Sequence, residues 1–139
     1  MYLTRFVQFR PPSPEERRLA ADVARVEAAA LTASRPGVTL GSVYDAMVRA
    51  YAQTGHPGAE MFHHQGGSCG YLSRDVVALP GMEVKLVPDG AVAWNPSLPG
   101  AKIEDTVLVT DAGHEVLTVD SRWPSVSVEG RARPDLLVR

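Results

Sequence analysis

The chain has 139 residues, of which 45% are hydrophobic and 22% are charged, and its formal net charge is -2. These values fit one globular domain over residues 1–139, and they argue against a basic nucleic-acid surface or a long charged tail. The single cysteine, Cys69, excludes a disulfide within the chain and favours a reducing compartment. No apolar run approaches the roughly 20 residues of a membrane span, and no secretory signal follows Met1. We therefore expect a cytoplasmic protein with no membrane or nucleic-acid partner.

The first half of the chain predicts one strand and two helices. Residues 2–9 are β-branched and aromatic, which indicates a strand. Ser13-Pro14-Glu15-Glu16 predicts a helix start, because the serine can cap, the proline suits the first helical position and the second glutamate completes a capping box. This helix is expected to end at Arg35-Pro36-Gly37, and Thr39 is expected to cap a second one that stops at Gly55. We interpret the apolar stripes of both helices as core packing.

Beyond Pro57, strand-like runs alternate with glycine and proline. They predict strands at residues 60–63, 76–79, 84–87, 91–94, 103–110 and 115–119. A turn at residues 111–113 joins the last two, so that residues 103–119 are expected to form a hairpin. The tail at 131–139 has too little pattern for a prediction. A strand, two helices and then a set of antiparallel strands indicate an α+β fold.

The first segment with chemical potential is His63-His64-Gln65-Gly66-Gly67. Two imidazoles followed by a glycine pair suit a site where the backbone closely approaches a ligand. Neighbouring side chains of a strand point to opposite faces, so one histidine would face a pocket and the other the core or solvent. The alternative is two polar residues at the end of a strand. In the second segment, Trp94-Asn95-Pro96, the Asn95 amide can form hydrogen bonds with a ligand.

The third segment, Glu104-Asp105, places carboxylates in an otherwise apolar strand, where burial is costly without a partner or a metal. The two face opposite sides, so only one can point inward. A histidine and a glutamate on separate strands could form half a metal site, whereas a salt bridge or an edge position is the structural alternative. Cys69 is interpreted as a small buried hydrophobe, and Arg74 as the local ion-pair partner of Asp75.

In their order, these segments resemble the pita-bread family of methionine aminopeptidase, Xaa-Pro aminopeptidase, prolidase and creatinase. His63–Gly67 resembles the family's Gly-His-Gly-x-Gly loop, with His64 on the ligand histidine. Asn95-Pro96 resembles the strand end that carries the first ligand Glu, and Glu104 resembles the last ligand Glu. Leu3-Thr4-Arg5 resembles the segment around the second ligand Asp. The resemblance implies half of a pita-bread fold, its C-terminal half, with two helices packed on a curved antiparallel sheet.

The resemblance also implies a metal site, because the family holds two divalent metals with two Asp, one His and two Glu. Only His64 and Glu104 match this set. Asn95 replaces a glutamate, and the first acidic residue of the chain is Glu15. A substrate-binding histidine of the family falls near Tyr71 without an equivalent. We expect a truncated, Xaa-Pro aminopeptidase-like protein without dinuclear-metal hydrolysis, in which Mn, Co or Zn binding is implied by the resemblance alone.

Three functions stay open. The first is a pseudoenzyme that binds a small molecule or peptide through the following residues: His63, His64, Gly66, Gly67, Asn95 and Glu104. The second is a hydrolase-like enzyme that uses His64 and Glu104 as acid–base groups or as a vestigial mononuclear metal site. The third is a fragment of a longer protein. Since half of a two-lobed fold exposes apolar surface, we also expect a homodimer.

Overall fold

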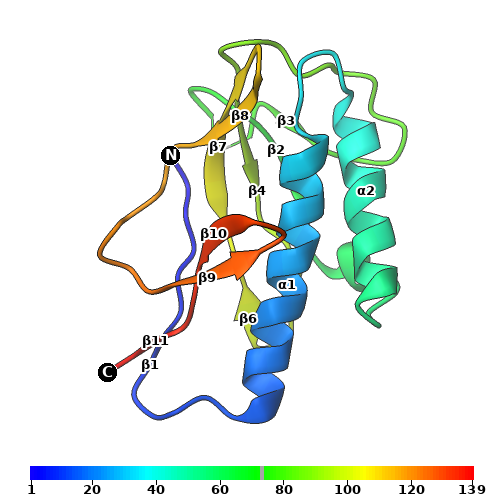
Figure 1. Ribbon diagram of the computed structural model, residues 1–139. Coiled ribbons are helices and arrows are strands. Elements are labelled where there is room, and N and C mark those ends of the chain that lie inside the picture. The colour runs from blue at the N-terminus through cyan, green and yellow to red at the C-terminus, as the bar shows by residue number, and fades with distance from the viewer. Residues whose placement is uncertain (73) are drawn as a thin grey trace.

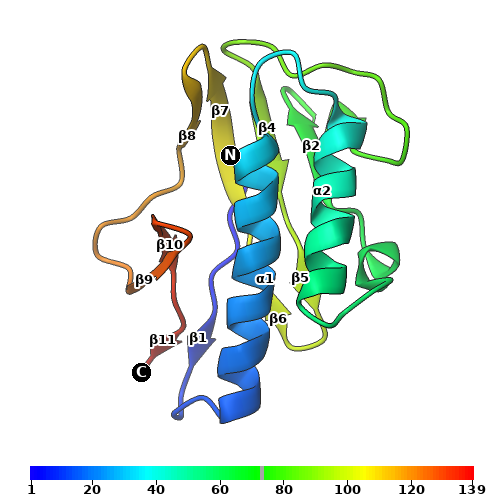
Figure 2. The same ribbon diagram turned by 45° about the vertical axis from the view of Figure 1, so that its right-hand side comes forward.

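The computed structural model describes residues 1–72 and 74–139 of the chain. Its two long helices, α1 (Pro14–Ala33) and α2 (Leu40–Gln53), lie side by side on one face of a sheet (Figure 1). Figure 2 shows the same helical layer covering the strands from a second direction. The α+β class and the packing of two helices on an antiparallel sheet are confirmed. No helix in the described ranges is long and apolar enough to cross a membrane.

Both helices begin where the sequence indicates. The Glu16 amide donates to Ser13 Oγ at 3.2 Å, and the Ser13 amide donates to Glu16 Oε2 at 2.7 Å, so the expected capping box is formed. At α2, the Ser42 amide donates to Thr39 Oγ1 at 3.1 Å. These side chains satisfy backbone donors that a helix start leaves without partners. A short 3-10 helix, η1 (Ala59–Phe62), follows α2.

The main sheet has five strands in the order β3-β2-β4-β7-β8, and all neighbours are antiparallel. Its strands are β2 (Gly66–Cys69), β3 (Val76–Val77), β4 (Ala91–Trp94), β7 (Asp105–Thr110) and β8 (Gly113–Val116). The hairpin expected at residues 103–119 is confirmed as β7 and β8.

Three smaller strand pairs complete the fold, namely β5 (Ser97–Leu98) with β6 (Ala101–Lys102), β9 (Ser125–Val128) with β10 (Arg131–Pro134), and β1 (Val7–Gln8) in parallel with β11 (Leu137–Val138). The last pair places residues 7–8 beside residues 137–138 at one edge of the molecule (Figure 1).

The core lies between the helices and one face of the main sheet. Trp94, Tyr51, Leu31, Met47 and Val107 are fully buried there. Trp94 on β4 reaches the end of α1, where its Nε1 donates to Ser34 Oγ at 2.8 Å. Because side chains alternate along a strand, the residue after Trp94 faces away from the helices.

Several expected strands are wrong or shorter than predicted. Residues 60–63 lie mainly in η1, and residues 84–87 form no strand. The latter segment instead bonds the loop before α2, where the Leu86 amide donates to the Val38 carbonyl at 2.8 Å. Within the strand expected at 2–9, only β1 is regular, and Thr4 forms an isolated bridge with Glu104.

Candidate functional site

The structure brings the three predicted segments together at one end of the main sheet. Trp94 pairs with Gly66 on β2 and with Asp105 on β7. The next row of residues across these strands, one residue further along each, therefore contains Asn95 beside Glu104. In this row the Asn95 backbone amide donates to the Gln65 carbonyl at 3.1 Å. The N-terminal segment completes this row across the strands, because the Thr4 amide donates to the Glu104 carbonyl at 3.0 Å.

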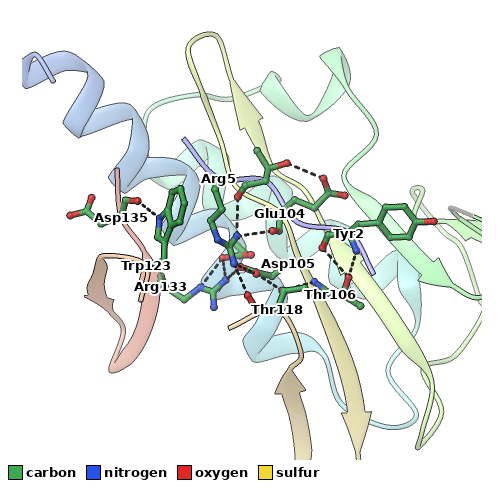
Figure 3. Close-up of polar contacts among 11 residues, drawn as sticks. Tyr2, Arg5, Glu104, Asp105, Thr106, Thr118, Trp123, Arg133 and Asp135 are labelled. Atoms are coloured by element: carbon green, nitrogen blue, oxygen red, sulfur yellow. Dashed lines mark hydrogen bonds and ion pairs between the residues drawn. The ribbon is translucent and has the colours of Figure 1, made fainter. Parts of the chain in front are cut away.

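Glu104 and Asp105 use separate sets of partners. Asp105 is fully buried, and Arg5, Thr118 and Arg133 all bond its carboxylate (Figure 3). The Glu104 carboxylate instead accepts from Thr4 Oγ1 at 3.0 Å and from Arg74 Nη2 at 2.8 Å. The expectation that the pair divides between two sides is confirmed by these contacts, and Glu104 is the member that belongs to the row with Asn95.

The ion pair between Arg74 and Glu104 is the central feature of this row. Both side chains are largely buried, with 9% and 12% of their surface exposed. Lys102 Nζ lies 3.9 Å from the other carboxylate oxygen, and the Arg74 guanidinium lies over the Tyr2 ring, 5.0 Å from its centroid. The sequence indicated Asp75 as the partner of Arg74, but the partner found is thirty residues away. Positive charge is therefore supplied to Glu104 by protein side chains.

His63 and His64 do not diverge as predicted. Their rings stack with centroids 4.5 Å apart and planes 23° apart, because both residues precede the first paired residue of β2. Partial burial lowers the pKa of His64, and the charges of His63, Arg74 and Lys102 lower it further against an opposing effect of Glu104. His64 is therefore neutral at pH 7 and belongs to a predominantly cationic neighbourhood.

A buried hydrogen-bond network positions the histidine segment. Gln65 is fully buried, its Oε1 accepts from the Tyr51 hydroxyl at 2.9 Å, and its Nε2 donates to the His63 carbonyl at 2.6 Å. The same hydroxyl accepts from the Ser97 amide at 2.8 Å. Burial raises the pKa of Tyr51 to about 12, which keeps the hydroxyl protonated. Tyr51, which belongs to the apolar stripe of α2, thus ties that helix to both the histidine segment and the turn after Asn95.

Gly66 and Gly67 serve the sheet rather than a ligand. Their φ angles are +125° and +153°, a region that favours glycine. A Cβ atom would lie 2.1 Å from the Ala93 carbonyl oxygen at Gly66 and 2.0 Å from the Val76 carbonyl oxygen at Gly67. The close approach that the glycine pair suggested is therefore between neighbouring strands.

Asn95 and Cys69 differ in their surroundings. Asn95 is 2% exposed, and its Oδ1 forms no hydrogen bond with a described residue. A buried amide oxygen without a partner is costly, which makes it a candidate acceptor for a ligand.

Cys69, expected to be buried, is half-buried in β2, and Arg74 Nη1 lies 3.6 Å from its sulfur. Partial burial raises the pKa of its thiol, which is the opposite of nucleophile activation.

The donor set does not fit the two divalent metals that the family resemblance implies. His64 and Glu104 are the two matching ligands, whereas catalytic zinc normally takes three from the protein. Within residues 1–72 and 74–139, no group of three or more His, Cys, Asp or Glu is placed to hold a metal ion. Both Glu104 oxygens already accept hydrogen bonds, and Asn95 has an amide where the resemblance implies a ligand carboxylate. No hydrolytic step through a metal follows from these residues.

Residues 2–111 match the sequence profile of metallopeptidase family M24, and the chain belongs to this family. Dipeptidase PepE from Mycobacterium ulcerans superposes with a TM-score of 0.77 at 28% identity, over 98% of this chain and 34% of that chain. The X-Pro aminopeptidase of Thermotoga maritima MSB8 gives a TM-score of 0.78 at 20% identity, over 99% of this chain and 37% of that one. The pita-bread fold inferred from the sequence is therefore confirmed.

Two curated relatives differ in what their names describe. The agropine synthesis cyclase of Rhizobium rhizogenes is 37% identical over 114 residues, which are 77% of this chain and 28% of the cyclase. An uncharacterized peptidase of Staphylococcus aureus strain MW2 is 29% identical over 123 residues, or 84% of this chain and 34% of the peptidase. The chain thus spans about a third of the length of these relatives.

Proposed function

We propose that this chain is a peptidase-related binding module that does not carry out dinuclear-metal peptide hydrolysis. The observation that carries the proposal is the 2.8 Å ion pair between Arg74 and Glu104. In this arrangement the Arg74 guanidinium lies beside the Glu104 carboxylate, which is the one carboxylate that matches the ligand set of the family. The protein would then bind a ligand at this end of the sheet through hydrogen bonds and charge, without a metal.

Electrostatics support the exclusion of a divalent cation. A unit positive charge about 4 Å from another costs roughly 4 kcal/mol at the effective dielectric of a protein surface, and a dication costs about twice that. A metal on Glu104 would face Arg74 and Lys102 together and would displace the Arg74 and Thr4 hydrogen bonds. The alternative of a mononuclear hydrolase using His64 and Glu104 is less well supported for the same reason.

The ligand we favour is a small molecule. The relative at 37% identity is named for a cyclase in agropine synthesis, whereas the relative at 29% is named as a peptidase. Asn95 Oδ1, buried and without a partner among the described residues, is the proposed acceptor. A peptide ligand is the second candidate, supported by the dipeptidase and aminopeptidase names of the structural neighbours. Cytoplasmic location is proposed from the single cysteine.

Calorimetric titration with Mn²⁺, Co²⁺ and Zn²⁺, paired with an assay of Xaa-Pro dipeptide hydrolysis, tests the metal claim. We expect no stoichiometric metal binding and no turnover by the wild type. Arg74→Met frees a Glu104 oxygen and should increase metal uptake, whereas Arg49→Met, at an exposed position on α2, should not. Two tightly bound metals per chain with peptide turnover in the wild type would overturn the proposal.

Ligand binding is tested by thermal shift with agropine and with the dipeptide Ala-Pro. We expect a saturable rise in Tm with agropine that is lost in Asn95→Ala. The control is Asn95→Asp, which keeps the oxygen acceptor and should retain part of the response. A saturable response to Ala-Pro alone would identify the site as a peptide-binding one, and an agropine response unchanged in Asn95→Ala would remove Asn95 from it.

We further propose that a second copy of this chain covers an exposed apolar surface of the fold. Met61, Phe62 and Leu72 are 82%, 87% and 66% exposed, and Tyr71 is fully exposed. Exposed apolar side chains in such number favour association. Light scattering should give a dimer that Phe62→Ser weakens, whereas Phe9→Ser, at a similarly exposed position on the N-terminal segment, should not. A monomer at millimolar concentration would refute this proposal.

A further inference from the structure

A second cluster of charged groups lies around Asp105, apart from the Glu104 carboxylate. Arg5 and Arg133 both approach the Asp105 carboxylate (Figure 3). These three residues line a cavity of about 160 Å³, and the rest of its wall comes from residues 119–125 and from the strand that carries Arg133. Most of this wall lies beyond residue 111, where the M24 match ends.

Two of the three guanidinium nitrogens of Arg133 donate hydrogen bonds to carboxylates. Its Nε and Nη2 donate to Glu27 Oε2 at 2.8 Å and 2.6 Å, and Nη2 also contacts Asp105. Its Nη1 forms no hydrogen bond with a described residue, although the side chain is only 2% exposed. A guanidinium carries five N–H donors in a planar fork, so this nitrogen retains two donors for another acceptor. The hydroxyl-bearing Ser121 and Ser125 line the same cavity.

The charges around the cavity leave an excess of positive charge. Burial raises the pKa of Glu27 to about 8, against the attraction of Arg133, so that Glu27 is mainly protonated at pH 7. The guanidiniums of Arg5 and Arg133 then share the carboxylate of Asp105. Asp120, at the cavity wall, is already paired with Arg122 at 3.1 Å. An anion in the cavity would balance the second guanidinium, because buried charges are stable only when they are paired.

We propose that this cavity binds a small oxyanion, either a carboxylate or a phosphate group, through Arg133 Nη1. The planar guanidinium fork matches both kinds of group, because each presents two oxygens in a plane. A volume of about 160 Å³ is ample for acetate or inorganic phosphate, since about 10–15 Å³ of such volume already holds one water molecule. The ligand would thus be a small anion or the acidic end of a small molecule.

The test uses the whole chain, labelled with ¹⁵N, titrated with sodium acetate, sodium phosphate and sodium chloride at matched ionic strength. Signals of the Arg133 Nε–H and of the Trp123 indole, which donates to the Asp135 carbonyl at 2.9 Å, report on the cavity. We expect saturable shifts with acetate or phosphate. Saturation by acetate alone would indicate a carboxylate ligand, and saturation by phosphate alone an inorganic anion.

Two obstructing variants and one control complete the test. Ser125→Leu on β9 and Ser121→Leu in the preceding loop should each weaken binding at least tenfold by filling the cavity. Ser127→Leu, an exposed serine on the same strand that lines a different surface groove, should bind as the wild type does. Linear shifts, equal shifts with chloride, or binding unchanged in both obstructing variants would overturn the inference. None of these results bears on metal exclusion at Glu104.

Discussion

The free energy of unfolding should depend on pH through Glu27, which is fully buried on α1. Its Oε2 accepts two hydrogen bonds from Arg133, whereas its Oε1 has no partner among the described residues. Burial raises the pKa of this carboxyl from its ordinary 4.5 to about 8, with Arg133 opposing the shift. The folded state therefore holds a proton that the unfolded chain releases. Stability from this group is complete below pH 4.5 and is lost as pH rises toward 8.

The perturbation is Glu27→Gln, which keeps the shape of the protonated side chain and cannot ionise. One pKa unit corresponds to 1.36 kcal/mol, so linkage through Glu27 lowers wild-type stability by about 2 kcal/mol between pH 6 and pH 8. The variant lacks this loss. The difference in unfolding free energy between variant and wild type should then shift by about 2 kcal/mol in favour of glutamine over that interval.

Urea denaturation of both proteins at pH 6, 7 and 8 measures this difference. The contribution of histidine titration to the unfolding free energy cancels in the difference, because the histidines are common to both proteins. Glu83→Gln, at an exposed position, is the matched control and should track the wild type at every pH. A variant–wild-type difference that stays constant within about 0.5 kcal/mol from pH 6 to pH 8 would refute the reasoning. It would mean that Glu27 is already ionised in the folded protein at pH 6, paired with Arg133.

Three further substitutions probe the elements that support the site. Gly66→Ala should destabilise the fold by more than about 3 kcal/mol in urea denaturation, since its Cβ would lie 2.1 Å from the Ala93 carbonyl oxygen. Tyr51→Phe should cost about 1–3 kcal/mol by leaving the buried Gln65 amide oxygen without a donor, and a change under 0.5 kcal/mol would contradict that role. Ser13→Ala should lower Tm by removing about 1 kcal/mol of capping energy from α1.

The helices could be predicted from sequence because their signals are local. Ser13 and Glu16 act within one turn, and the boundaries of α1 follow from residues adjacent in the chain. Residues 60–63 and 84–87 have strand-like composition, but their structure depends on distant partners. Gly58, at φ +86°, leads the chain into η1, and residues 84–86 bond the loop before α2 instead of the sheet. Strand β2 was not predicted, because glycines at two of its four positions conceal it.

The position of the candidate site could be predicted from the sequence, but the contacts of its side chains could not. The resemblance of the segments around His64, Asn95 and Glu104 to the family predicted that they lie together, and β2, β4 and β7 pair accordingly. The partner of Glu104 was not predictable, since Arg74 lies thirty residues away and has an acidic neighbour beside it in the sequence. Electrostatic partners across a sheet depend on register and side-chain reach, which no local pattern encodes.

The Arg74 contact changes what the missing carboxylates imply for function. A site that had only lost Asp and Glu ligands would leave Glu104 a buried anion without compensation, and such a site would still attract a cation. Here Thr4, Arg74 and Lys102 surround that carboxylate, so the remaining anion is already compensated by the chain. Restoring a carboxylate alone, as in Asn95→Glu, should therefore not restore metal binding. Asn95→Glu combined with Arg74→Met should bind metal more tightly than either single variant by calorimetry, and equal binding by the double and single variants would show that Arg74 does not exclude the cation.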